Sequence, residues 1–172
     1  MKRHYTKERS GACDGFTLIE TLVYVSLYAM IFGGMLASMY TLVESDARNE
    51  TVAMMEEEGN YLIGKIDAAV LHAASVQSPA ESGTALSVLV AGGSSIRITE
   101  RDSSMRLQMD GSAAETLNNT DVSVQNLNFV HTLPTGDGSN PESVSVSFTL
   151  VATTSDGHLL SQEFSTLEYV RI

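Results

Sequence analysis

The stretch GFTLIE at residues 15–20, followed by TLVYVSLYAMIFGGMLASMYTLV at 21–43, decides how the chain is organised. Residues 21–43 carry no formal charge, and as a helix they are long enough to cross a bilayer, for which about 20 residues suffice. Glu20 stands at the entrance, although a carboxylate at bilayer depth costs roughly 2.5–3.5 kcal/mol. The stretch therefore predicts a membrane helix whose first turn carries a carboxylate in need of a partner.

The charges on either side of this run predict its orientation. Lys2, Arg3, Lys7 and Arg9 precede it, whereas mainly acidic residues follow from Glu44 onward. Under the positive-inside rule the leader stays in the cytoplasm and the C-terminal part is exported, as in a single-pass membrane protein. An ordinary secretory signal peptide and a plain signal anchor are the competing interpretations. The run lacks a clean pair of small residues for signal peptidase, and neither alternative explains a short leader that ends in Gly before Phe-Thr-Leu-Ile-Glu.

The motif Gly15-Phe16-Thr17-Leu18-Ile19-Glu20, with its short basic leader and uncharged helix, resembles the class III signal of type IV pilins and type II secretion pseudopilins. The resemblance implies that residues 1–15 are a leader peptide. A prepilin peptidase would cut after Gly15 and methylate the new amino terminus on Phe16. Residues 16–43 would then remain as a transmembrane helix and, after assembly, as the filament core.

Cleavage before Phe16 would give Glu20 a physical role. It creates an α-amine at the positive end of a helix dipole, and a carboxylate four residues later lies one turn away on the same face. The carboxylate can pair with that amine or with the amine of a neighbouring subunit, and family resemblance favours the neighbour. Contact with lipid headgroups is the alternative.

After the apolar run, residues 44–78 are expected to continue the helix in amphipathic form. Apolar and small residues recur at spacings of three and four, which places them on one face. We expect this face to pack under the C-terminal domain, with the helix running from about Phe16 to Val76 and stopping before Ser78-Pro79. The positions are Val52, Met55, Gly59, Leu62, Ile66, Ala69, Ala73 and Val76.

Residues 79–172 are expected to form an antiparallel β domain. In SVSVSFTL (143–150), apolar and hydroxyl residues alternate strictly, as in a strand with one buried face. VSVQNLNF (122–129) changes phase, which predicts a bulge near Gln125-Asn126. Asp156-Gly157 predicts a hairpin. Further strands are expected at 85–90, 95–99 and 105–109. The fold class is thus α+β, a pilin-like long helix packed against one sheet of four to six strands.

A looser resemblance covers residues 44–172 and concerns the kind of subunit. The long helix followed by LNNTDVSVQNLNFV and SVSVSFTL is similar to J-type pseudopilins and W-type minor pilins. Major pilins usually have a Pro where this chain has Ala37, and many have a C-terminal disulfide, whereas Cys13 in the leader is the only cysteine here. The resemblance implies a minor subunit near the filament tip that helps to initiate assembly. Its partners would be the prepilin peptidase, sibling pilin or pseudopilin subunits, the inner-membrane assembly platform and, before assembly, membrane lipid.

Composition argues against two other classes of function. A formal charge of −11 is unsuited to binding nucleic acid directly. His4, His72, His131 and His158 are isolated, without paired ligand spacing, so we expect surface or half-buried histidines and no enzymatic activity. The rival function is a signal-anchored protein that does not polymerise and displays an acidic binding domain outside the cytoplasm.

One loop offers a candidate for calcium. TGDGSNPES (135–143) places Asp137, Asn140 and Glu142 close together, and oxygen ligands of this kind bind calcium. Some pseudopilins have a calcium loop, but the spacing differs from that of an EF-hand. A solvated loop without a cofactor is the alternative, and it is the one we expect.

Overall fold

The computed structural model describes residues 17–134 and 141–170 of the chain. The chain divides into two compact units, residues 1–43 and 44–172. Helix α1 (Leu18–Leu71) begins in the first unit and ends in the second. The described strands all lie in the second unit: β1 (Ala73–Ser78), β2 (Ser82–Gly83), β3 (Ala85–Val90), β4 (Ser95–Arg101), β5 (Ser104–Met109), β6 (Glu115–Thr116), β7 (Val122–Thr132), β8 (Ser143–Thr153) and β9 (Leu159–Tyr169).

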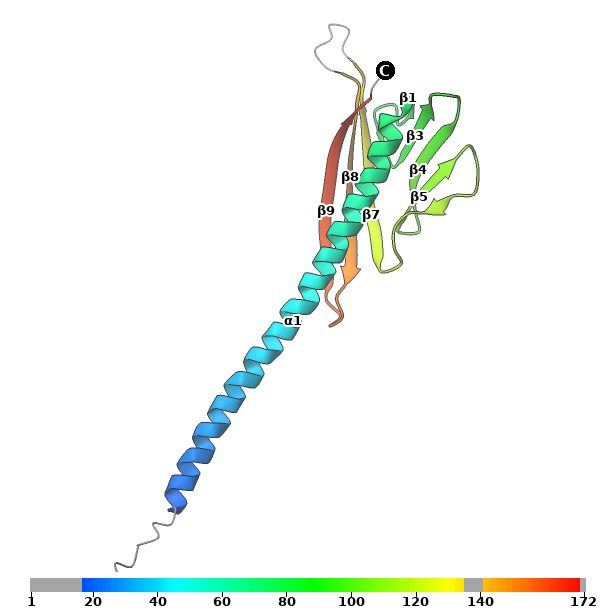
Figure 1. Ribbon diagram of the computed structural model, residues 1–172. Helices are drawn as coiled ribbons and strands as arrows, with labels where there is room; N and C mark the ends of the chain where they lie inside the picture. The colour runs from blue at the N-terminus through cyan, green and yellow to red at the C-terminus, as the bar shows by residue number, and fades with distance from the viewer. Residues whose placement is uncertain (1–16, 135–140, 171–172) are drawn as a thin grey trace, which may run out of the picture. The chain divides into compact units, whose positions relative to one another are not determined.

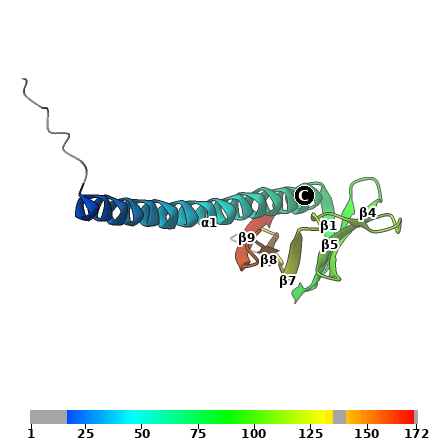
Figure 2. The ribbon, with the colours of Figure 1, turned by 90° about the horizontal axis from the view of Figure 1, so that it is seen from below.

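The strands form two antiparallel sheets, which Figures 1 and 2 show as separate groups. One sheet has the order β1-β3-β4-β5-β6, and the other has the order β2-β7-β8-β9. Within the second sheet, β8 pairs with β7 on one side and with the whole length of β9 on the other. The α+β class is confirmed, with one long helix that contacts antiparallel sheets.

The C-terminal part of α1 packs with the buried stripe that its sequence predicts. Met55, Gly59, Leu62, Ile66 and Ala69 are all buried. They join a core to which both sheets contribute, including the fully buried rings of Phe129 and Phe148. Burial of a side chain of that size stabilises a fold by roughly 1.5–3 kcal/mol. This shared core holds helix and sheets of the second unit together.

The predicted end of the helix was wrong. The helix stops at Leu71, and residues 73–78 form strand β1 instead of a last helical turn. Ala73 pairs with Val90 and Val76 with Val88, so the backbone groups of this segment are satisfied by β3. A spacing of three between Ala73 and Val76 fits a helix, but tertiary pairing overrides it. Ser78-Pro79 therefore ends a strand and not the helix.

The strands at the predicted positions are present, and two local predictions are confirmed. The register of β7 against β8 shifts between Gln125 and Asn128, and Asn126 has a positive φ of 56°. This bulge brings Leu127 and Phe129 to the buried face that Val122 and Val124 already occupy. At the second position, Gly157 has φ 88° in the turn between β8 and β9. Gly157 N donates to Thr154 O at 2.9 Å, which closes that hairpin.

The single sheet expected from the sequence is replaced by two. The N-terminal strands of the domain, β3, β4 and β5, pair among themselves and leave β7, β8 and β9 as a separate layer. Hydrogen bonds between the layers include Val124 N to Ser103 O at 2.8 Å and Leu127 N to Glu100 Oε2 at 3.0 Å. The second bond satisfies an amide that the bulge of β7 removes from the ladder. The two sheets are therefore fastened at the bulge.

Candidate functional site

The first turn of α1 contains the candidate assembly residue, Glu20. Thr17 precedes the helix, and its carbonyl oxygen accepts hydrogen bonds from Glu20 N at 3.0 Å and Thr21 N at 3.2 Å. Thr17 Oγ1 also accepts from Glu20 N at 3.4 Å. These bonds satisfy amides that a helix start otherwise leaves unpaired. Glu20 is thus an acidic side chain in the first helical turn, where the dipole favours negative charge.

Glu20 is exposed, and among residues 17–134 and 141–170 its carboxylate has no hydrogen bond or ion pair. Gly15 and Phe16, the residues of the expected cleavage site, lie outside the described residues. The amine that would appear on Phe16 is therefore not tested as a partner. The pairing of Glu20 remains a prediction.

The helix beyond Glu20 presents large apolar side chains on every side. Between Thr17 and Val43 the only formally charged residue is Glu20, and the apolar side chains of this segment are exposed. Ser26 and Thr41 turn their hydroxyls back to helix carbonyls, with distances of 2.8 and 2.9 Å. The segment therefore offers few free polar groups. It is long and apolar enough to cross a membrane, or to serve as a signal sequence.

The calcium candidates are only partly described. Asp137 and Asn140 lie outside the described residues, whereas Glu142 precedes β8. Glu142 Oε1 lies 2.9 Å from His131 Nε2, and His131 Nδ1 lies 3.2 Å from the carbonyl oxygen of Pro79. One Glu142 oxygen is thus already engaged by a side chain, and calcium binding by the loop remains untested.

His131 departs from the expectation of a surface or half-buried histidine. It is buried, and its ring contacts Pro79, after β1, through one nitrogen and Glu142, just before β8, through the other. Its backbone N also donates to Glu81 O at 2.8 Å. Contacts on both ring nitrogens give His131 a role in fixing three segments together. The sequence shows no signal for this, because Pro79 and Glu142 are far from His131 in the chain.

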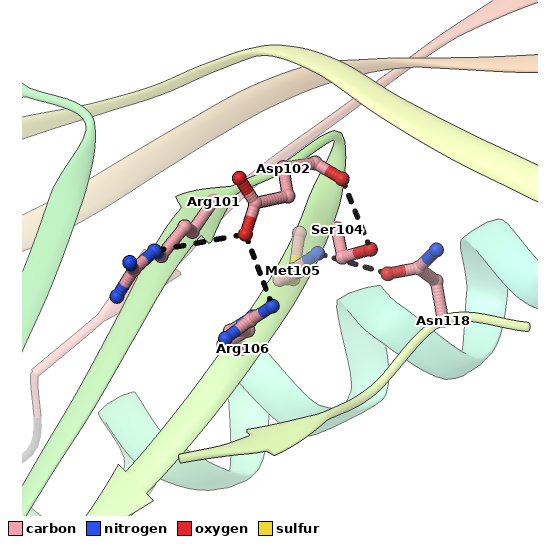
Figure 3. A network of polar contacts seen from close by, with 6 residues as sticks. All are labelled: Arg101, Asp102, Ser104, Met105, Arg106 and Asn118. Carbon is pink, nitrogen blue, oxygen red and sulfur yellow. Dashed lines mark hydrogen bonds and ion pairs between the residues drawn. The ribbon is translucent and has the colours of Figure 1, made fainter.

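A polar network joins the β4–β5 hairpin to the loop before β7 (Figure 3). Asp102 lies between two guanidinium groups, 3.6 Å from Arg101 Nε and 3.3 Å from Arg106 Nη2. Asn118 is buried, and its Oδ1 accepts from Met105 N at 2.9 Å while its Nδ2 donates to Val122 O at 2.7 Å. Exposed ion pairs like those of Asp102 contribute about 0–1 kcal/mol. These contacts support the local structure of the β4–β5 hairpin and of the loop before β7.

A second cluster was missed by sequence reasoning, which treated His158 as isolated. Glu44 on α1 and Asp156 and His158 in the β8–β9 turn place one potential ligand atom each within 4.8 Å of one another. The hydrogen bond from Thr154 Oγ1 lowers the pKa of the Asp156 carboxyl below its ordinary value, because it stabilises the ionised form. Only the hairpin signal Asp156-Gly157 was visible in the sequence, and nothing there pointed to Glu44.

Comparisons with known proteins return no match: no family model, no curated protein and no solved structure resembles the chain significantly. The architecture itself is pilin-like, with a long apolar N-terminal helix followed by antiparallel β-sheets. A functional assignment therefore depends on the N-terminal motif and on this arrangement of elements.

Proposed function

We propose that the protein is a minor pilin or pseudopilin, a membrane-anchored structural subunit of a type IV pilus or of a type II secretion or competence pseudopilus. The observation that carries the proposal is a helix that begins at Leu18, within GFTLIE, runs through the uncharged and exposed residues 21–43, and leads into a β domain. An ordinary signal sequence is removed after export, whereas this helix is continuous with the helix that packs in the core of the domain. Retention of the apolar segment fits a subunit that uses it for assembly.

In this proposal the prepilin peptidase cuts between Gly15 and Phe16 and methylates Phe16. Before assembly, the apolar side chains of residues 18–43 lie in lipid, with the leader in the cytoplasm and the β domain outside. On assembly they exchange lipid for the helices of sibling subunits. This exchange keeps apolar surface away from water at both stages.

Glu20 would favour the move from lipid into the filament. A carboxylate at bilayer depth is costly when unpaired, and the amine of a neighbouring subunit would compensate it. The cost of leaving it unpaired therefore favours docking at the base of a filament. The inner-membrane assembly platform would present the subunit for this step.

We further propose that the subunit acts near the filament tip or in initiation, and that its function is structural and not catalytic. The helix is not interrupted by proline, because Ala37 occupies the position at which major pilins usually have one. This feature supports a minor subunit.

The test is the mass of the N-terminal peptide of the protein extracted from membranes, in cells with and without a prepilin peptidase. We expect residues 1–15 to be absent and the terminus at Phe16 to be methylated only when the peptidase is present. A Gly15→Leu variant should remain uncleaved in the same cells. An intact leader in the presence of the peptidase would instead support a signal-anchored protein that does not polymerise.

A further inference from the structure

Three side chains with metal-binding chemistry meet where the β8–β9 turn reaches α1. Glu44, Asp156 and His158, which we call the turn cluster, each place one potential ligand atom within 4.8 Å of the others. All three lie in the unit that begins at Glu44. Glu44 is far from Asp156 and His158 in sequence, so the cluster is made by the tertiary fold and not by local spacing.

The two carboxylates of the turn cluster are not paired with a lysine or an arginine among the described residues. Glu44 and Asp156 bring two carboxylates together, and like charges at this distance repel each other. The basic group at Asp156 is His158, whose Nε2 lies 3.8 Å from Asp156 Oδ2, beyond hydrogen-bonding distance. The three potential ligand atoms thus lie near one another without being hydrogen-bonded to each other.

The turn itself holds two of the three groups in place. Thr154 is buried, and its Oγ1 donates to Asp156 Oδ1. The same hydroxyl oxygen accepts from His158 N at 2.9 Å, and Thr154 N donates to His158 O at 2.8 Å. The Asp156 carboxylate keeps its second oxygen, Oδ2, on the side of His158. Asp156 and His158 therefore present ligand atoms from an ordered turn, and the helix supplies Glu44.

The donor set selects a class of ion. Carboxylate oxygens alone suit calcium, but an imidazole nitrogen is a ligand for zinc and neighbouring transition metals. We propose that Glu44, Asp156 and His158 bind a divalent first-row transition metal ion, for which zinc is the probe, and that the ion fastens the β8–β9 turn to α1. Around a tetrahedral zinc ion with bonds of about 2.1 Å, ligand atoms lie about 3.4 Å apart. Exposed side chains that already converge need only small rotations to reach this spacing.

Binding at the turn cluster has a structural consequence. The site uses the first residue of the C-terminal unit and the tip of its β8–β9 hairpin, so an ion there would add a direct bridge between the helix and this hairpin. The three protein ligands leave a fourth position for water. Because the site lies on the exposed surface, a bound ion exchanges with solvent, and the bridge depends on metal concentration. This inference does not rest on the proposed filament function.

The experiment is calorimetric titration of zinc chloride into the full chain in detergent micelles at pH 7. All proteins carry Cys13→Ser, because a leader thiol would itself bind zinc. The ligand variants are Glu44→Gln and His158→Gln, both at exposed side chains whose replacement leaves the backbone bonds of the turn intact. The matched control is His72→Gln, which removes another exposed histidine. Calcium is titrated in parallel.

We expect one zinc ion to bind per chain and to raise the unfolding temperature. Each ligand variant should weaken zinc binding by at least about tenfold, since even outer groups around a metal change affinity by that factor. His72→Gln should bind as the parent does. Three results would overturn the proposal: no zinc binding by the parent, parent-like affinity in either ligand variant, or calcium binding that matches zinc and ignores His158→Gln.

Discussion

The ring of Phe164 in β9 lies directly against Gly59 of α1, so closely that a Cβ on Gly59 would overlap Cε1, Cζ and Cδ1 of the ring. Phe164 stacks on Phe148 with ring centroids 5.6 Å apart and an interplanar angle of 13°. The half-buried ring thus contacts both the helix and β8. Glycine at this position allows helix and sheet to approach.

We therefore expect Gly59→Ala to destabilise the protein. Overpacking of this kind costs about 1–3 kcal/mol, partly offset by the gain of up to about 1 kcal/mol from replacing a helical glycine. Gly64→Ala is the matched control, because a Cβ there meets nothing within 4 Å. Denaturant unfolding of the full chain in detergent should show a loss for Gly59→Ala and a gain for Gly64→Ala. Equal effects would show that Phe164 yields easily.

Asn118→Ala should also destabilise the domain, for a different reason. The substitution leaves Met105 N and Val122 O without their buried side-chain partner, and each unpaired group costs about 1–3 kcal/mol. Asn119→Ala is the control, since Asn119 is exposed and, within the described part of the chain, its side chain accepts one hydrogen bond, from Thr120 Oγ1 at 3.2 Å. We expect the control to stay within about 0.5 kcal/mol of the parent in the same unfolding measurement. A parent-like Asn118→Ala would mean that water replaces the amide.

Much of the fold follows from local patterns in the sequence. If one face of each strand must be buried, the alternation in 143–150 requires a regular strand and the phase change at Gln125-Asn126 requires a bulge. The structure contains both. The end of α1 was missed because no glycine or proline lies between Gly64 and Pro79 to mark it. Residues 73–78 form a strand because they pair with β3. The periodicity of a segment gives no information about such pairing with another segment.

The number of sheets and the turn cluster could not be predicted from the sequence for a similar reason: both depend on contacts between distant segments. Alternation reveals which face of a strand is buried but not which strands share a sheet, so β3–β5 and β7–β9 were expected to form one layer. Likewise, a sequence motif reveals only those site residues that lie close together in the chain. Glu44 lies near His158 only because the β8–β9 turn lies beside the helix, and no sequence pattern indicates this contact.

The carboxyl of Asp156 should titrate below its ordinary pKa near 3.8, because the hydrogen bond from Thr154 favours the ionised form. A lowered pKa in the folded state contributes stability that is present above the ordinary value. That contribution is lost as pH falls through the folded-state pKa. NMR titration of the side-chain carboxyl carbon, in buffer with a chelator, measures the midpoint directly. Thr154→Val should move the midpoint upward, whereas Thr153→Val, next to it at the end of β8, should not. An unchanged midpoint in Thr154→Val would assign the shift to another group.

Glu20→Ala should leave processing largely intact and impair assembly. In the proposed function the peptidase cuts between Gly15 and Phe16, a step that would not need the carboxylate, whereas docking would need a partner for the amine that this cut creates. The measurements are the N-terminal mass of the membrane-extracted protein and its recovery with sheared filaments. Glu50→Ala, an exposed acidic residue further along α1, is the control and should assemble as the parent does. Normal co-assembly of Glu20→Ala would remove the pairing role. Loss of cleavage in that variant would place Glu20 in recognition by the peptidase instead.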